Sequence, residues 1–308
     1  MINIELKGLI GNIEKVIVGK TEAVKLLLVG LLTNGHILIE DVPGLGKTML
    51  SLALAKSISG DFKRIQFTPD LLPSDVTGGF VYNPKTGDFE FKKGPVFANI
   101  LLADEINRTT PRTQSALLEC MQEFKVTLDG KTFAIEQPFM VIATQNPIEY
   151  QGTYALPEAQ IDRFLMKINM GYLSFADEVK VVSEQKIQHP IDSLTPFMDL
   201  AMVLKLQEEV KKIEMSSHVL DYIVKLVTLT RNKEDIKLGA SPRASIALMK
   251  ASCAWALLDG RDYVIPEDVE TLLPWILKHR ITLHPKASVA GKTPEIIISE
   301  LLKSTPIP

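Results

Sequence analysis

Short apolar runs alternate with helix-like segments in the first half of the chain. Residues 36–40, 100–103 and 139–143 form apolar runs that are followed by polar or turn-forming residues. Runs of this length are typical of strands buried on both faces of a sheet. Residues 24–32 and 48–57 instead place apolar residues at helical spacing. Strands that alternate with helices predict an α/β fold with a parallel sheet.

Two further segments have the pattern of β-hairpins. Residues 124–128 and 131–136 alternate apolar and polar positions around Asp129-Gly130, a pair that favours a tight turn. Residues 80–82 and 88–91 do the same around a longer turn. We therefore expect two hairpins inserted into the α/β core. The first hairpin carries aromatic residues that either contact a partner or form plain cross-strand pairs: Phe80, Tyr82, Phe89 and Phe91.

The second half of the chain, from about residue 175, is predicted to be helical, with no convincing strand. Ser241-Pro242 is a typical helix start, and a helical pattern follows as far as Gly260. Pro266 opens another helix, in which Pro274 predicts a kink or a break. We expect an α/β domain over residues 1–174, a linker over 175–195 and a helical domain over 196–308.

The composition is that of an ordinary soluble globular protein, with 46% hydrophobic and 23% charged residues and a net charge of -3. This acidic balance argues against a dedicated nucleic-acid binder. The first residues lack the pattern of a signal peptide, and apolar stretches such as 26–32 are too short to span a bilayer. We expect a cytoplasmic protein without membrane insertion. The two cysteines, Cys120 and Cys253, predict neither a disulfide framework nor a zinc site.

A glycine-rich loop precedes one of three Gly-Lys-Thr tripeptides in the chain. Only Lys47 follows a strand and such a loop and also opens a helix, which is the arrangement that binds nucleotide phosphates. We expect Lys47 to pair with the β- and γ-phosphates of ATP and the Thr48 hydroxyl to ligate Mg²⁺. The strict pattern has Gly at position 41, where this chain has Asp41. The predicted loop residues are Val42, Pro43, Gly44, Leu45, Gly46, Lys47, Thr48 and Met49.

Polar side chains follow two of the predicted strands. Asp104 and Glu105 end the strand at 100–103, at the sheet edge where ligands bind in such folds. We expect Asp104 to hold Mg²⁺ and Glu105 to orient and deprotonate the attacking water. A solvated acidic loop is the alternative. Asn146 follows the strand at 139–143; its amide either holds the γ-phosphate or the water, or Asn146-Pro147 simply starts a turn.

Five motifs in this order resemble the MoxR family of AAA+ ATPases, and the likeness covers nearly the whole chain. The resemblance implies a five-stranded core, a helical lid and a ring that is usually hexameric. The motifs are Asp41-Val42-Pro43-Gly44-Leu45-Gly46-Lys47-Thr48, Phe67-Thr68-Pro69-Asp70-Leu71-Leu72-Pro73-Ser74-Asp75, Ala103-Asp104-Glu105-Ile106-Asn107-Arg108, Ala143-Thr144-Gln145-Asn146-Pro147 and Leu156-Pro157-Glu158-Ala159-Gln160-Ile161-Asp162-Arg163-Phe164.

The resemblance also implies roles for single residues. Asn146 is implied to be the sensor beside the acidic pair. Arg163 is implied to be the arginine finger, which reaches the ATP of the neighbouring subunit, and Arg243 to be the sensor of the lid. The segment with Val18 and Gly19 resembles the family's patch against the adenine.

Three functions fit these features. The first is a chaperone-like remodelling motor; relatives of this kind act on proteins with a von Willebrand factor A (VWA) domain or on metalloenzyme assemblies. The second is an AAA+ module that acts on nucleic acid, such as a helicase-like or transcription-activating core, for which Lys92-Lys93 is the only local support. The third is a chelatase-type subunit. We favour the motor, with an unidentified client protein.

Overall fold

The computed structural model describes residues 2–147, 153–184 and 189–307. Its centre is the predicted parallel sheet, which has five strands. Neighbouring strands pair in parallel throughout, and β1 lies between β8 and β9. Across the sheet the order is β2 (Phe62–Gln66), β5 (Ile100–Asp104), β8 (Met140–Gln145), β1 (Ile37–Glu40) and β9 (Met166–Ile168).

The apolar runs correctly predicted β1, β5 and β8 but not the two edge strands. β2 reads Phe-Lys-Arg-Ile-Gln, and only Ile65 in it is buried. β9 has just three residues, of which Lys167 is half-buried. An edge strand has solvent on one side and therefore needs no continuous apolar run, so neither segment stands out in the sequence.

Helices cover both faces of the sheet because successive strand residues point to opposite sides. Ile37 and Ile39 of β1 pack against the first group of helices, while Leu38 packs on the other face. The first group is α1 (Ile2–Glu14), α2 (Thr21–Leu32) and α3 (Lys47–Ser57). The other face carries α4 (Pro73–Thr77), η1 (Pro95–Phe97), η2 (Ile106–Arg108) and α5 (Pro111–Glu123).

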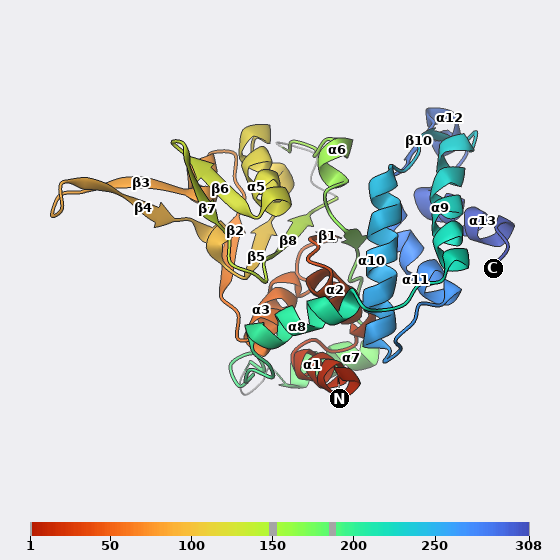
Figure 1. The fold of residues 1–308 in the computed structure, drawn as a ribbon, viewed down its shortest axis with the longest axis horizontal. Helices are drawn as coiled ribbons and strands as arrows, with labels where there is room; N and C mark the ends of the chain where they lie inside the picture. The colour runs from red at the N-terminus through yellow and green to blue at the C-terminus, as the bar shows by residue number, and fades with distance from the viewer. Residues whose placement is uncertain (1, 148–152, 185–188, 308) are drawn as a thin grey trace.

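Both predicted hairpins are present. β3 (Gly78–Asn83) pairs with β4 (Asp88–Lys93), and β6 (Lys125–Leu128) with β7 (Lys131–Ala134). Phe133 of the second hairpin stacks on Phe91 of the first, with 4.0 Å between ring centroids. The β3–β4 hairpin projects from the molecule as an arm, at the opposite end from the last helices of the chain (Figure 1).

The segment that we predicted as a linker contains a helix, because residues 175–184 are helical. Residues 185–188 of that segment lie outside the described residues. The helices are α7 (Phe175–Glu184), α8 (Leu200–Val210), α9 (Ser217–Asn232), α10 (Pro242–Leu258), α11 (Pro266–Leu277), α12 (Pro285–Val289) and α13 (Pro294–Ser304). The small α6 (Glu158–Ile161) precedes β9.

Two details of the helical part differ from the sequence-based prediction. α11 continues through Pro274, so the predicted break does not occur there. β10 (Ile236–Leu238) and β11 (Thr282–Leu283), which we did not predict, form a short antiparallel pair. The predicted start of α10 is confirmed, since the Ser241 side chain accepts a hydrogen bond from the Arg243 amide.

One apolar cluster joins the sheet to the lid. It contains Ile37 and Ile142 of the sheet, Leu27 of α2 and Leu248 of α10, all fully buried. The lid helices therefore share a core with the ATPase-like half of the molecule. None of the helices in the described ranges is long and apolar enough to cross a membrane.

Candidate nucleotide site

The glycine-rich loop lies between β1 and α3. Gly44 and Gly46 both have a φ of +86°, a left-handed conformation that favours glycine. α3 begins at Lys47, directly after this turn. The first amides of a helix have no partner within it, so the start of α3 offers N–H donors and a partial positive charge to an anion.

Lys47 lies among carboxylates. Its Nζ donates a hydrogen bond to the carbonyl oxygen of Asp41 at 2.7 Å. Partial burial lowers the pKa of Lys47, while the charges of Asp41, Asp104 and Glu105 raise it. The amine of Lys47 is therefore close enough to these three carboxylates for their charges to favour its protonated form.

Asp41, the departure from the strict loop pattern, has a structural role. Its carboxylate oxygen Oδ2 accepts hydrogen bonds from the amides of Met170 and Gly171, the second at 3.1 Å. These residues follow β9, so Asp41 ties the start of the loop to the neighbouring edge of the sheet. A glycine at this position could not make this connection.

A cavity of about 260 Å³ opens at the carboxyl end of the sheet. It brings together most of the predicted phosphate and metal residues: Pro43, Gly44, Gly46, Lys47, Thr48, Met49, Asp104, Glu105 and Asn146. Thr48 and Asp104 supply two oxygen ligands, and Mg²⁺ bound with a nucleotide takes others from phosphates and water. The residues present thus fit the MgATP that the sequence predicts.

Hydrogen bonds fix the orientation of the Asp104 carboxylate. Its Oδ1 accepts a bond from the Thr144 hydroxyl at 2.6 Å, and its Oδ2 accepts one from Arg64 Nη2 at 2.6 Å. Thr144 is fully buried on β8, while Arg64 is on β2. The neighbouring strands therefore hold the carboxylate at the cavity from both sides.

Glu105 has an unusual backbone. Its φ of 56° and ψ of 51° are left-handed, which costs free energy for any residue with a side chain. The Glu105 amide donates to Thr144 Oγ1 at 2.8 Å, which holds this conformation. Its Oε2 accepts bonds from Gln66 Nε2 at 2.6 Å and from Arg108 Nη1 at 2.9 Å. The carboxylate is therefore tied down on one oxygen.

Sequence reasoning missed three residues of this site: Arg64, Gln66 and Thr144. Arg64 and Gln66 lie two residues apart on β2, so their side chains share one face of the sheet. In the parallel register, Gln66 lies opposite Asp104. Recognising β2 as a strand next to β5 would have identified both. Thr144 lies within a quoted motif, two residues before Asn146.

A second, largely apolar cavity of about 480 Å³ adjoins the loop and shares Pro43, Gly44, Gly46 and Met49 with the first. Val18 and Leu45 line it, as predicted residues of the nucleotide site. Gly19 is absent from its lining: its φ is +69°, and Asp177 occupies the space that a side chain would need. Val42 is absent from the linings of both cavities. Further lining residues include Tyr172, Val181 and Val182.

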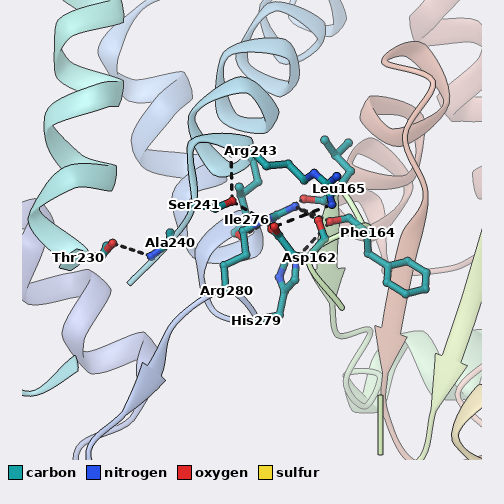
Figure 2. A network of polar contacts seen from close by, with 10 residues as sticks. All are labelled: Asp162, Phe164, Leu165, Thr230, Ala240, Ser241, Arg243, Ile276, His279 and Arg280. Atoms are coloured by element: carbon teal, nitrogen blue, oxygen red, sulfur yellow. Dashed lines mark hydrogen bonds and ion pairs between the residues drawn. The ribbon is translucent and has the colours of Figure 1, made fainter. Parts of the chain in front are cut away.

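The two predicted arginines lie together but in neither of these cavities. Arg163 and Arg243 line a small cavity of about 160 Å³ with Met121 and Gln122. Arg243 Nη1 lies 4.0 Å from Asp162 Oδ2, beside Ser241 at the start of α10 (Figure 2). The structure thus separates this pair from the phosphate loop of the same chain.

Comparison with known proteins identifies the family. Residues 36–166 match the ATPase family associated with various cellular activities (AAA), and residues 228–301 match the AAA lid domain. Chaperone MoxR1 of Mycobacterium tuberculosis is 43% identical in an alignment that covers 98% of this chain and 82% of that protein. The chain belongs to the MoxR family of AAA+ ATPases.

Two further proteins match it over nearly its whole length. The Bacillus subtilis protein named Uncharacterized protein YeaC is 54% identical over 297 residues, which are 96% of this chain and 93% of that protein. A crystal structure of a Cytophaga hutchinsonii protein, assigned as an ATPase, has 43% identity and a TM-score of 0.92, covering 100% of this chain and 96% of the other. MoxR membership confirms the predicted AAA+ core and helical lid and supports ATPase activity in general.

Proposed function

We propose that this MoxR-family chain hydrolyses MgATP in a cytoplasmic ring of identical subunits and uses that energy to remodel a partner protein. One observation carries the ATPase part of the proposal. A single cavity gathers Lys47, Thr48, Asp104 and Glu105 at the start of α3. Phosphoryl transfer to water needs amides that bind phosphate, an amine, a pair of oxygens that bind the metal, and a carboxylate base.

In this proposal the nucleotide spans both cavities. The phosphates meet the loop amides and Lys47, and Mg²⁺ is held by Thr48 and Asp104. The adenine base would enter the second, largely apolar cavity, against Val18 and Met49. Bound Mg²⁺ would supply charge stabilisation for the transferred phosphoryl group.

Glu105 would act as the general base toward the attacking water, and Asn146 would hold the water or the γ-phosphate. Both line the same cavity. The bonds from Gln66 and Arg108 occupy Glu105 Oε2 in the structure. Deprotonation of water is favoured by a carboxylate with a free oxygen, so these two donors would set how readily Glu105 acts.

Arg163 and Arg243 would act on the nucleotide of the neighbouring subunit. Their position away from the phosphate loop of their own chain supports this role. An arginine supplied by a neighbour stabilises charge on the transferring phosphoryl group, with an effect of roughly 10³–10⁵ in rate. The site would then be complete only in a closed ring, which we propose to be a hexamer.

The hairpins are the proposed contact with a client protein, possible clients being VWA-domain proteins and metalloenzyme assemblies. Tyr82 and Phe89 at the arm are 53% and 68% exposed, which supports a working role beyond cross-strand pairing. The relative named Chaperone MoxR1 supports a chaperone-like function. The support that Lys92-Lys93 gives to nucleic-acid binding is reduced, because Lys93 Nζ lies 3.9 Å from the acidic Glu136 Oε1.

Capture with two site variants tests this function. Glu105→Gln should bind MgATP and retain it, because the base is lost but the phosphate contacts remain. Lys47→Ala should fail to bind ATP and serves as the empty control. Proteins retained by each are identified by mass. A protein held only by the ATP-bound Glu105→Gln form supports the remodelling motor, whereas recovery of nucleic acid alone would refute it. Unchanged ATP affinity in Lys47→Ala would refute the phosphate site itself.

A further inference from the structure

Arg280 joins the lid to the core by an unusually complete set of bonds. It follows α11 and is only 7% exposed. Its guanidinium has five N–H donors, and five hydrogen bonds use them. Three go to carbonyl oxygens of Asp162, Phe164 and Leu165 in the core, at 3.2, 2.6 and 2.9 Å. The others go to Asp162 Oδ1 at 2.6 Å and to the Ile276 carbonyl at 2.5 Å.

Asp162 is the point where these elements meet. One carboxylate oxygen accepts from Arg280, and the other accepts from the Ser241 hydroxyl at 3.1 Å. That second oxygen also lies 4.0 Å from Arg243. Figure 2 shows the end of α11, the start of α10 and the segment after α6 converging on this carboxylate. Asp162 directly precedes Arg163 in the chain.

The same turn of the lid also holds the far end of β9. Lys278 donates to the Asn169 side chain, and Asn169 in turn donates to the Glu40 carbonyl at 2.6 Å. Arg280 binds the residues before β9, and Lys278 binds the residue after it. The lid thus fixes the backbone of the Arg163 segment relative to the sheet.

We propose that Arg280 and Asp162 form a latch between lid and core that positions Arg163 and Arg243 together for the neighbouring subunit's nucleotide. The proposal rests on the proposed trans role of these arginines. The two cations that line one small cavity repel each other. The Asp162 carboxylate, 4.0 Å from Arg243 Nη1, offsets this repulsion on the Arg243 side, and the bonds of Arg280 orient Asp162. Neither latch residue lines the two nucleotide cavities, so both are positioning residues.

Asp162→Asn tests the latch with little change of shape. The amide keeps an acceptor for Arg280 but loses the charge that holds Arg243. We expect kcat for ATP to fall at least tenfold, while KM and the affinity for a fluorescent ATP analogue stay within twofold. The variant Arg163→Ala should also be slow. If Asp162 acts through Arg163, the double variant Asp162→Asn/Arg163→Ala will be no slower than Arg163→Ala alone, because coupled residues are not additive.

The lid offers a matched control in a second Arg–Asp pair. Arg261 Nη1 and Nη2 donate to Asp268 at 2.8 and 2.5 Å, within the lid alone. Asp268→Asn should lower the melting temperature but leave kcat unchanged. If Asp162→Asn does not fold, Arg280→Lys replaces it, since it keeps the charge but not the five-donor fork.

Each outcome decides the proposal. Normal turnover in Asp162→Asn, with Arg163→Ala slow, overturns the latch and leaves the finger role intact. Additive losses in the double variant overturn it as well, because Asp162 then acts by another route. Normal turnover in Arg163→Ala removes the trans finger itself, and the latch falls with it. Slow turnover in both single variants without further loss in the double variant supports the latch.

Discussion

At the scale of single residues, the site depends on backbone conformations that only certain side chains accept. Gly44 and Gly46 turn the loop at a φ of +86°, and Glu105 accepts a φ of 56° at a cost. The glycines let loop amides face the cavity. Glu105 is instead held by the Thr144 hydroxyl. Left-handed backbone conformations thus occur both in the glycine-rich loop and at the end of β5, and both places line one cavity.

Gly46→Ala should weaken ATP binding about tenfold, because a left-handed alanine costs roughly 1–2 kcal/mol and the loop relaxes away from its phosphate-binding shape. Isothermal titration with ATP measures the effect. The control is Gly11→Ala in α1, where a Cβ meets nothing within 4 Å. Equal affinities for the two variants would contradict the role of the loop turn.

The buried His36 makes the fold sensitive to acid. Its Nδ1 accepts from the Val141 amide and its Nε2 donates to the Met121 carbonyl, both at 2.9 Å, so the ring is neutral. Burial lowers the pKa of His36 to about 4 from 6.5. The unfolded chain therefore takes up a proton first, and stability is complete above about pH 6.5 and lost as pH falls toward 4.

This contribution is on the order of 3 kcal/mol at most. Urea unfolding at several pH values measures it. His36→Gln keeps one donor and one acceptor and should flatten the loss of stability between pH 6.5 and 4.5. Some slope will remain, because burial also lowers the pKa of His279. His218→Gln on the surface of α9 is the control; the same slope in both variants would speak against His36.

How far single residues could be predicted from the sequence depended on strand context. Lys47, Thr48, Asp104, Glu105 and Asn146 line one cavity, and each could be singled out because it follows a recognisable apolar strand. Gly19 and Val42 were predicted to contact the nucleotide but are absent from the linings of both cavities. The catalytic roles assigned to these residues stay predictions. The small cavity that Arg163 and Arg243 line could not be predicted, because only the folded chain brings the segment after α6 next to the start of α10.

At the scale of elements, an aromatic contact between the two hairpins holds the β3–β4 arm in position. Phe133 of β7 stacks on Phe91 of β4, and Phe80 of β3 lies 6.2 Å from Phe133 between ring centroids. The inserted hairpins therefore support each other at the base of the arm. Farther out, Tyr82 and Phe89 contact only each other among the aromatic pairs of the described residues.

Phe133→Ala should loosen the arm without unfolding the core. An aromatic pair contributes about 1 kcal/mol beyond its buried area, so amides of β3 and β4 should exchange about fivefold faster. Hydrogen-exchange mass spectrometry resolves these peptides. Phe89→Ala, at a ring 68% exposed, removes only the pair with Tyr82, so it should speed exchange at most in the outer part of the arm and reduce client capture. Faster exchange in Phe89→Ala but not in Phe133→Ala would refute this division of roles.

Elements were predictable where one physical signal dominated. Proline after a capping residue located the start of α10, and apolar runs located the central strands. β2 was not predicted because this edge strand contains Lys63 and Arg64 and therefore lacks an apolar run. Pro274 does not break α11, because the helix continues as its buried residues pack, despite one lost backbone bond.

At the scale of the whole molecule, core and lid should unfold together. The apolar cluster runs from the sheet through α2 to α8 and α10, so separating the lid would expose it to water. Both tryptophans of the chain, Trp255 and Trp275, lie in the lid. Tryptophan fluorescence and calorimetry should therefore report one transition at the same temperature.

Leu206→Ala tests this cooperativity, because Leu206 is 1% exposed within the shared cluster. The substitution should lower stability by about 2–5 kcal/mol and shift the whole transition. The conservative Leu206→Met should shift it less. Two separated heat-absorption peaks in either variant would mean that the lid is an independent folding unit.

The arm has a further consequence for how the free chain behaves at high concentration. β3 and β4 form a sheet of their own, so both outer edges carry unpaired backbone groups that invite strands of other molecules. Charged side chains interrupt β4 at Asp88, Glu90, Lys92 and Lys93. Repulsion and hydration at these positions oppose edge-to-edge association, so the arm can stay extended without seeding aggregates. Neutralising these charges would lower the solubility of the chain and favour association between the arms of different molecules.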